Sequence, residues 1–203
     1  MRTLVLLVLL WLPGRALAAE GMTLYVFSPT SGRTHEVEKK LKKALPSVEV
    51  TVFGRLADFR NALTNAPPDA AIAPRPVLEE LSLKPELQGL LGTEDSETYV
   101  LMSTEPGLTR DALSSKVVGT IDLLGHKKMG GFVALLLGVK AAPKILSVTK
   151  TEDLLPLLQF KSADVVLVPE SALETLKSRS QMDLQILRLD GVRVGRAAVA
   201  FPA

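Results

Sequence analysis

The sequence contains no cysteine, which excludes disulfides, thiolate metal sites and thiol nucleophiles. Aromatic residues make up only 4% of its 203 residues, too few for the stacking surfaces that bind single-stranded nucleic acid. Positive and negative charges nearly balance as well. The formal net charge is +2, and subtracting Arg2 and Arg15, which lie in a segment that we expect to be removed, leaves 22 basic against 22 acidic residues. No overall field then attracts nucleic acid or lipid, and we expect no nucleic-acid partner.

The apolar and charged content indicates a folded protein. Hydrophobic residues make up 47% of the chain and charged residues 23%, which is unlike the composition of disordered segments. A chain of this length buries a core without disulfides or metals. At roughly 100–200 residues per domain, it forms one domain or two small lobes.

Long apolar runs are missing, and the short one at the N-terminus indicates export. Arg2 precedes the apolar run Leu4–Leu12, and Ala16-Leu17-Ala18 follows a Pro-Gly break. Nine apolar residues are too few to cross about 30 Å of hydrocarbon as a membrane anchor, which is the alternative interpretation. Small residues at 16 and 18 suit a signal peptidase. We therefore predict a signal peptide over residues 1–18, cleaved after Ala18, and a periplasmic protein.

Strand and helix patterns alternate along the rest of the chain. The segment 34–45 places Val37, Leu41 and Leu45 on one face at helical spacing. Apolar strands with helices between them imply a parallel sheet covered on both faces, and hence an α/β fold. The very apolar segment 131–139 (GFVALLLGV) predicts a buried helix. The first predicted elements are strands at 23–27, 48–53 and 70–73, and helices at 34–45 and 56–64.

The second half of the chain resembles the first when it is shifted by 95 residues. Residues 56–81 align with 151–176 without a gap, and seven of the 26 positions are identical, among them Asp69/Asp164 and Pro74/Pro169. The same shift aligns strand 23–27 with 118–122 and strand 50–53 with 145–148. Shared register across four elements favours a structural repeat. The alternative is that any two α/β halves align when strands are placed on strands.

Two further strands are predicted outside the repeats, at 97–104 (ETYVLMST) and 196–201 (RAAVAF). Two such crossings between two lobes make a hinge. The carboxyl ends of the strands in both lobes then face a common cleft, where open α/β sheets bind ligands. We predict a first lobe of residues 19–98 plus 190–203 and a second lobe of residues 99–189.

The motifs of common enzymes and nucleotide-binding proteins are absent. The two histidines, His35 and His126, lack metal-binding spacing, and there is no GxSxG elbow, Walker-type loop or GxGxxG turn. Carboxylates such as Asp122 are possible bases, but no nucleophile accompanies them. We therefore expect no enzyme, no cofactor and no metal.

The loops that follow the strands are better candidates for a site. Residues 28–34 (SPTSGRT) combine hydroxyls, a glycine and backbone N–H groups before a helix, which either cradle an anion or simply cap the helix. The shift of 95 matches Ser31, Gly32 and Arg33 to His126, Lys127 and Lys128. Both lobes are thus expected to present basic residues at the same loop.

A second pair of candidates follows the third strand of each repeat. Arg75 follows Pro74, and Glu170 follows Pro169 at the equivalent position. An arginine opposite a glutamate across a cleft would suit a zwitterion or hold the lobes shut. Ordinary surface charges on loops remain the alternative.

The order of these segments resembles the type II periplasmic substrate-binding proteins of ABC importers, especially their phosphonate- and phosphite-binding branch. The resemblance spans nearly all of the mature chain, and in that family the loop after the strand matching Val117–Asp122 binds phosphonate oxygens through hydroxyls and a glycine. Here this loop reads Leu123–Gly130 (LLGHKKMG), without serines, and the chain lacks the closing helices usual for the family. The segments that carry the resemblance are the signal peptide, YVFSPTSGRTHEVEKKL, ETYVLMST, KVVGTIDLLGHKKMGG and TEDLLPLLQFKSADVVLVPESALETL.

The resemblance implies a two-lobed, periplasmic-binding-protein-like (type II) fold, each lobe a mostly parallel sheet flanked by helices, joined by two crossing strands. It implies a monomeric solute-binding component that closes on a small anionic, phosphonate- or phosphate-like solute and works with an inner-membrane ABC permease. An exported accessory binding module without a transport role is the alternative, and an enzyme is the third hypothesis. The expected ligand-binding residues are Ser28, Thr30, Ser31, Gly32, Arg75, Ser103, Thr120, Asp122, His126, Lys127, Lys128 and Glu170.

Overall fold

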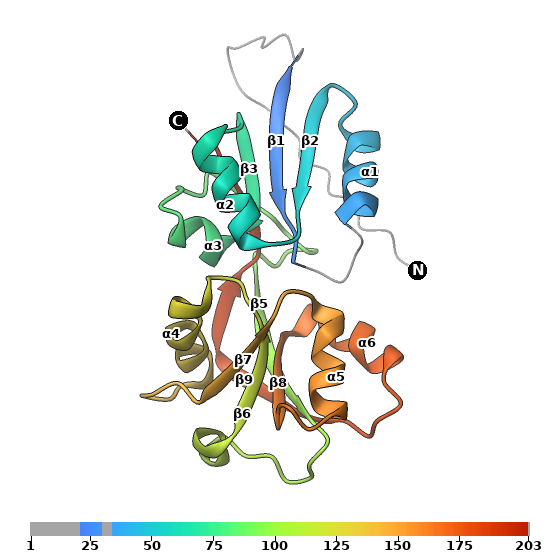
Figure 1. Ribbon diagram of the computed structural model, residues 1–203, viewed down its shortest axis with the longest axis vertical. Helices are drawn as coiled ribbons and strands as arrows, with labels where there is room; N and C mark the ends of the chain where they lie inside the picture. The colour runs from blue at the N-terminus through green and yellow to red at the C-terminus, as the bar shows by residue number, and fades with distance from the viewer. Residues whose placement is uncertain (1–20, 30–33, 203) are drawn as a thin grey trace.

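Two five-stranded sheets divide the protein into two lobes, which lie one above the other in Figure 1. The computed structural model describes residues 21–29 and 34–202. The first sheet has the strand order β2-β1-β3-β10-β4. Its elements are β1 (Met22–Phe27), β2 (Val48–Phe53), β3 (Ala70–Pro74), β4 (Leu87–Gln88) and β10 (Ala197–Ala200), with helices α1 (Thr34–Ala44), α2 (Leu56–Asn65) and α3 (Arg75–Glu80).

The second sheet has the strand order β7-β6-β8-β5-β9. Short 3₁₀ helices, η1 (Asp111–Ser115) and η2 (Thr151–Asp153), lie in its connections. Its strands are β5 (Ser96–Ser103), β6 (Val117–Ile121), β7 (Lys144–Val148), β8 (Val165–Pro169) and β9 (Gln185–Gly195), and its helices are α4 (His126–Leu137), α5 (Leu154–Gln159) and α6 (Glu170–Arg179).

Each sheet has three parallel strands at one side, followed by a strand that runs antiparallel to them. In the first sheet β1 pairs in parallel with β2 and β3, whereas β10 runs antiparallel to β3. In the second, β6 pairs in parallel with β7 and β8, and β5 runs antiparallel to β8. The predicted two-lobed α/β fold with mostly parallel sheets is confirmed.

The chain passes between the lobes at two short connections, residues 89–95 and Arg196. The predicted crossing strands exist, but β5 lies wholly within the second sheet and β10 wholly within the first. Strand β9 was not predicted, because Gly191 at φ +112° interrupts its alternation and a bulge opposite residues 97–99 shifts its register. The division at residues 98/99 and 189/190 stays a prediction, since strand pairing does not show where independently folding units end.

The repeat is visible in the strand register. Strands β3 and β8 are 95 residues apart, as predicted. However, Leu24 pairs with Val50, whereas Val118 pairs with Ile145, so β1 and β6 match at a shift of 94. The predicted match of 23–27 to 118–122 is therefore wrong by one residue, because the second half has one extra residue between its first two strands.

Asp69 and Asp164, identical in the two repeats, accept equivalent hydrogen bonds in the two lobes. The backbone N–H of Thr23 donates to Asp69 Oδ2 at 2.7 Å, and that of Val117 donates to Asp164 Oδ2 at 2.6 Å. Each carboxylate thereby binds the first residues of a central strand. The sequence identity at this position is explained by strand anchoring.

The buried core extends through both lobes. One contiguous cluster contains Phe59 and Leu78 of the first lobe together with Leu101 and Val133 of the second. A smaller cluster around Leu24 fills the opposite face of the first sheet. The predicted buried helix at 131–139 lies in α4, which ends at Leu137 and is followed by Gly138 at φ +68°.

Among the described residues, none of the helices has both the length and the apolar character that crossing a membrane requires.

Candidate functional site

The loops that were expected to bind a ligand follow strands whose carboxyl ends point toward the other lobe. Figure 1 shows β1 and β2 running toward the lower lobe, with α3 and α4 facing each other across the junction. Ser28 follows β1, and its backbone N–H donates to the carbonyl of Phe53 at 2.9 Å. Thr30, Ser31 and Gly32 lie outside the described residues.

The matching loop of the second lobe leads from β6 into α4. Asp122 is half-buried, and its Oδ1 accepts a hydrogen bond from the N–H of Gly125 at 2.7 Å. Gly125 has φ +83°, a backbone conformation that favours glycine over residues with a side chain. His126 and Lys127 then open α4 with exposed side chains. Asp122 therefore stabilises the turn that places the His126 and Lys127 side chains at the N-terminus of α4.

Lys128 is also exposed but already has a partner in the other lobe. Its Nζ lies 2.6 Å from Oε1 and 2.7 Å from Oε2 of Glu80, the last residue of α3. Lys127, its neighbour, has no ion pair with any residue among 21–29 and 34–202. The three predicted residues of this turn are thus brought together, but one of them contacts a protein carboxylate.

Two predicted residues are buried in the second sheet. Thr120 is the fourth of the five residues of β6, only 3% exposed, between Ser147 of β7 and Leu167 of β8. Ser103 is fully buried, and its hydroxyl donates to the carbonyl of Asp164 at 2.9 Å. Because β5 runs antiparallel to β8, Ser103 lies opposite Val165, at the end of the sheet away from the other lobe. Ser103 therefore lies far from the predicted cleft, whereas a solute contact of Thr120, near the carboxyl end of β6, stays a prediction.

Arg75 and Glu170 begin equivalent helices but have different partners. Arg75 Nε lies 2.8 Å from Oε1 of Glu79, one turn along α3, and both side chains are exposed. Glu170 accepts a hydrogen bond from the Thr98 hydroxyl and pairs with Arg188 at 3.0 Å. The Thr98 hydrogen bond, followed by the Arg188 contact, lowers the pKa of Glu170 below its usual value. Each residue is therefore paired within its own lobe.

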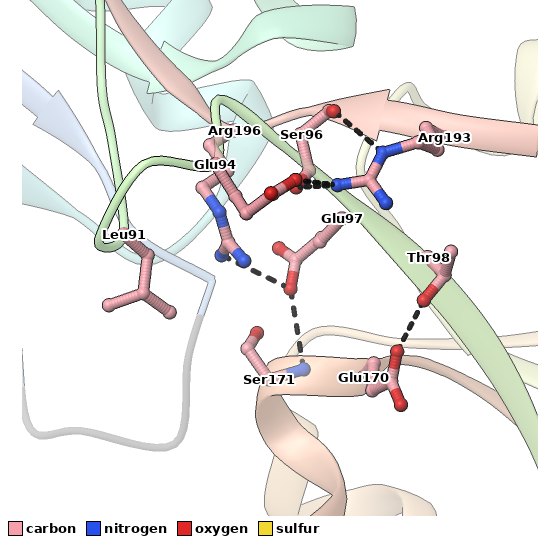
Figure 2. A pocket seen from close by; sticks show the side chains of 9 residues that line it. All are labelled: Leu91, Glu94, Ser96, Glu97, Thr98, Glu170, Ser171, Arg193 and Arg196. Carbon is pink, nitrogen blue, oxygen red and sulfur yellow. Dashed lines mark hydrogen bonds and ion pairs between the residues drawn. The ribbon is translucent and has the colours of Figure 1, made fainter.

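A pocket of about 380 Å³ lies where the chain passes between the lobes. Figure 2 shows its lining, which comes from the 91–98 segment, the start of α6 and the end of β9. Of the predicted residues that the structure describes, Glu170 alone lines it. The full lining is Leu91, Glu94, Ser96, Glu97, Thr98, Glu170, Ser171, Arg193 and Arg196.

Ion pairs across this pocket connect the two crossing segments. Arg196 Nη1 lies 3.3 Å from Oε2 of Glu97, and both side chains are only 18% exposed. The same Glu97 oxygen accepts the N–H of Ser171 at 3.3 Å, at the start of α6. Arg193 pairs with Glu94 and donates from Nε to the Ser96 hydroxyl at 3.0 Å. Figure 2 shows these contacts as two separate groups beside each other, Arg196–Glu97–Ser171 and Arg193–Glu94–Ser96.

Sequence reasoning missed Glu94, Glu97, Arg193 and Arg196. Their partners are about a hundred positions away in sequence, 97 for Arg193 and Ser96 and 99 for Arg193 and Glu94. The available signal was the charge that flanks both predicted crossing strands. Across residues 21–29 and 34–202, the structure contains no group of three or more histidine, aspartate or glutamate side chains placed to hold a metal ion.

The architecture is that of two-lobed α/β binding proteins. No known protein family matches the sequence, and no curated protein matches it. Among solved structures, the arginine 3rd transport system periplasmic binding protein of Legionella pneumophila is 16% identical, with a TM-score of 0.60 over 90% of this chain and 86% of that one.

Two further solved structures have the same architecture. The substrate binding protein of an amino acid ABC transporter is 17% identical, with a TM-score of 0.60 over 90% of this chain and 85% of that one. The periplasmic aliphatic sulphonate binding protein of Escherichia coli is 12% identical, with a TM-score of 0.56 over 90% of this chain and 65% of that one. At these identities the likeness shows the fold, which is the periplasmic-binding-protein-like fold.

Proposed function

We propose that this chain is the periplasmic solute-binding component of an ABC-type importer, with lobes that close on a small anionic solute. The observation that carries this proposal is the pair of lobes with equivalent strand orders, joined by two short connections. Such connections allow hinge closure, and ligands of open α/β sheets bind outside the carboxyl ends of the strands. The similar solved structures, which include transporter binding proteins for arginine, an amino acid and aliphatic sulphonates, support a binding role over a catalytic one.

The anionic character of the solute is inferred from the turn before α4. A helix of 12 residues presents unpaired backbone N–H groups and the positive end of its dipole at its first turn. His126 and Lys127 add exposed side chains at the same place. A phosphonate, phosphate or similar anion would therefore be bound by backbone and ammonium donors together.

Export and delivery to a permease complete the proposal. The sequence of residues 1–18 supports export through a cleaved signal peptide. A protein that captures a solute outside the inner membrane needs a membrane partner to deliver it, which here would be an ABC permease. The chain itself would act as a monomer and without a cofactor.

A second candidate is an exported accessory binding module on the same scaffold. Two observations favour it: Lys128 is paired with Glu80, and one apolar core continues through both lobes. Four large apolar side chains are also exposed on β4, on the segment after it and beyond β10, where a protein ligand could contact them: Leu87, Leu90, Leu91 and Phe201.

Thermal-shift screening separates the two candidates. A ligand present at 100 times its dissociation constant stabilises the folded state by about 2.7 kcal/mol, which raises the Tm of a protein of this size by roughly 5–10 °C. We expect a shift of this size with at least one member of a panel of phosphonates, phosphate, sulfate, carboxylates and amino acids. A hit confined to anions supports the proposal. No shift across the panel contradicts it and favours the accessory module.

A further inference from the structure

The Glu80–Lys128 ion pair joins two helices that belong to different lobes. Glu80 ends α3, which follows β3 of the first sheet, and Lys128 lies in the first turn of α4, which follows β6 of the second. Figure 1 shows α3 and α4 facing each other across the junction. We propose that this pair is a latch that holds the lobes in the arrangement described here when no solute is bound.

The geometry of the pair fits a latch better than an incidental surface contact. The Lys128 ammonium reaches both carboxylate oxygens of Glu80, at 2.6 and 2.7 Å. The Glu80 side chain is only 16% exposed, although that of Lys128 is 60% exposed. Partial burial of the carboxylate reduces screening by water and salt, so the attraction is stronger than between two fully exposed side chains.

The Glu80–Lys128 pair lies away from the two short connections between the lobes, where other ion pairs are found. Glu97 and Arg196 are paired where the chain itself passes between the lobes, so covalent connectivity keeps them near each other in any arrangement. Glu80 and Lys128 have no such connection, because they lie in α3 and α4, outside the two segments that pass between the lobes. Rotation of one lobe against the other therefore has to break the Glu80–Lys128 contact. This inference goes beyond the proposed function, since it concerns the protein without a solute.

The absence of cysteine makes a direct test possible. Two cysteines introduced at the exposed positions Lys40 in α1 and Thr175 in α6 carry the only spin labels of the purified, exported chain. Pulsed electron paramagnetic resonance then measures the distance between the lobes. Glu80→Gln and Lys128→Gln should each raise the ratio of separated to latched molecules, by roughly 1.5–5-fold for an ion pair that is partly exposed.

The double variant shows whether the two residues act through each other. Glu80→Gln/Lys128→Gln should resemble either single variant, and the exchanged pair Glu80→Lys/Lys128→Glu should return the ratio toward that of the parent. Lys43→Gln, which removes an exposed lysine of α1 that lies outside the candidate site, is the matched control and should leave the ratio unchanged. Unchanged distances in both single variants overturn the latch, as does a double variant whose effect is the product of the two single effects. The exchanged pair keeps the test valid if a single variant unfolds.

Discussion

The two lobes have equivalent strand orders, but their helices are packed differently. In the first lobe none of residues 34–44, which form α1, is buried, and Val37 and Leu41 are only partly covered. In the second lobe α4 buries four side chains, Met129, Val133, Leu136 and Leu137. The difference follows from sequence, since α1 (THEVEKKLKKA) is mostly charged and α4 (HKKMGGFVALLL) is apolar after its first turn. A shared topology therefore fixes which loops face each other, but not how firmly each lobe is packed.

The same contrast appears on the central strands. At the shift of 94, Tyr25 of β1 matches Gly119 of β6. The Tyr25 ring packs edge-on against Phe53, with centroids 5.2 Å apart. A Cβ at Gly119 would lie 2.8 Å from Leu157 Cδ1 and 3.0 Å from Val166 Cγ1. In the second lobe a side chain at this position would require Leu157 of α5 to shift, whereas the first lobe has an aromatic ring at the matching position.

Truncating one leucine in each of the two helices tests the packing difference. Leu136→Ala in α4 should lower the free energy of unfolding by about 2–5 kcal/mol, because the side chain is 3% exposed and its removal leaves a cavity. Leu41→Ala in α1 should cost about 1 kcal/mol, because water already reaches this side chain. Urea denaturation measures both. Equal costs would show that α1 is packed as firmly as α4.

The strand anchor at Asp69 gives a smaller, pH-dependent effect. Hydrogen bonds from the backbone N–H of Thr23 and then from its hydroxyl lower the pKa of Asp69 below its usual value. The folded state favours the ionised carboxylate. The stabilisation is therefore complete above the pKa of Asp69 in the unfolded chain, about 4, and is lost as the pH falls through its pKa in the folded protein. The difference in Tm between the parent and Asp69→Asn should therefore be larger at pH 6 than at pH 3. A difference that is the same at both values would contradict this role.

Much of the fold was predictable, because it depends on local patterns. The strands at 48–53 and 70–73, the helix at 56–64 and the repeat itself follow from alternation, helical spacing and the identity of Asp69 and Asp164. A gap-free alignment could not detect the extra residue between β6 and β7. The direction of β5 was also hidden, and the predicted residue Ser103 lies at the end of its sheet away from the other lobe.

The candidate site was less predictable, because its contacts join distant segments. Lys128 follows His126 and Lys127 directly in the chain, but nothing in its neighbourhood in sequence indicates Glu80 as its partner. The ion pairs Glu97–Arg196 and Glu94–Arg193, at the junction between the lobes, likewise depend on how β5, β9 and β10 meet. Such pairs follow from the assembled topology, and a single sequence contains no pattern that fixes them.

The most direct test of an anionic solute at the α4 turn is calorimetric titration of the strongest anion of the thermal-shift panel into Lys127→Glu. The substitution replaces an ammonium by a carboxylate beside backbone donors, and charge-assisted hydrogen bonds contribute about 1.5–3 kcal/mol. We expect the affinity to fall by at least roughly 100-fold, since each 1.4 kcal/mol corresponds to a factor of ten. The matched control is Lys43→Glu, an exposed position near the end of α1, which should bind as the parent does. Equal affinities of the two variants would contradict an anion site at this turn.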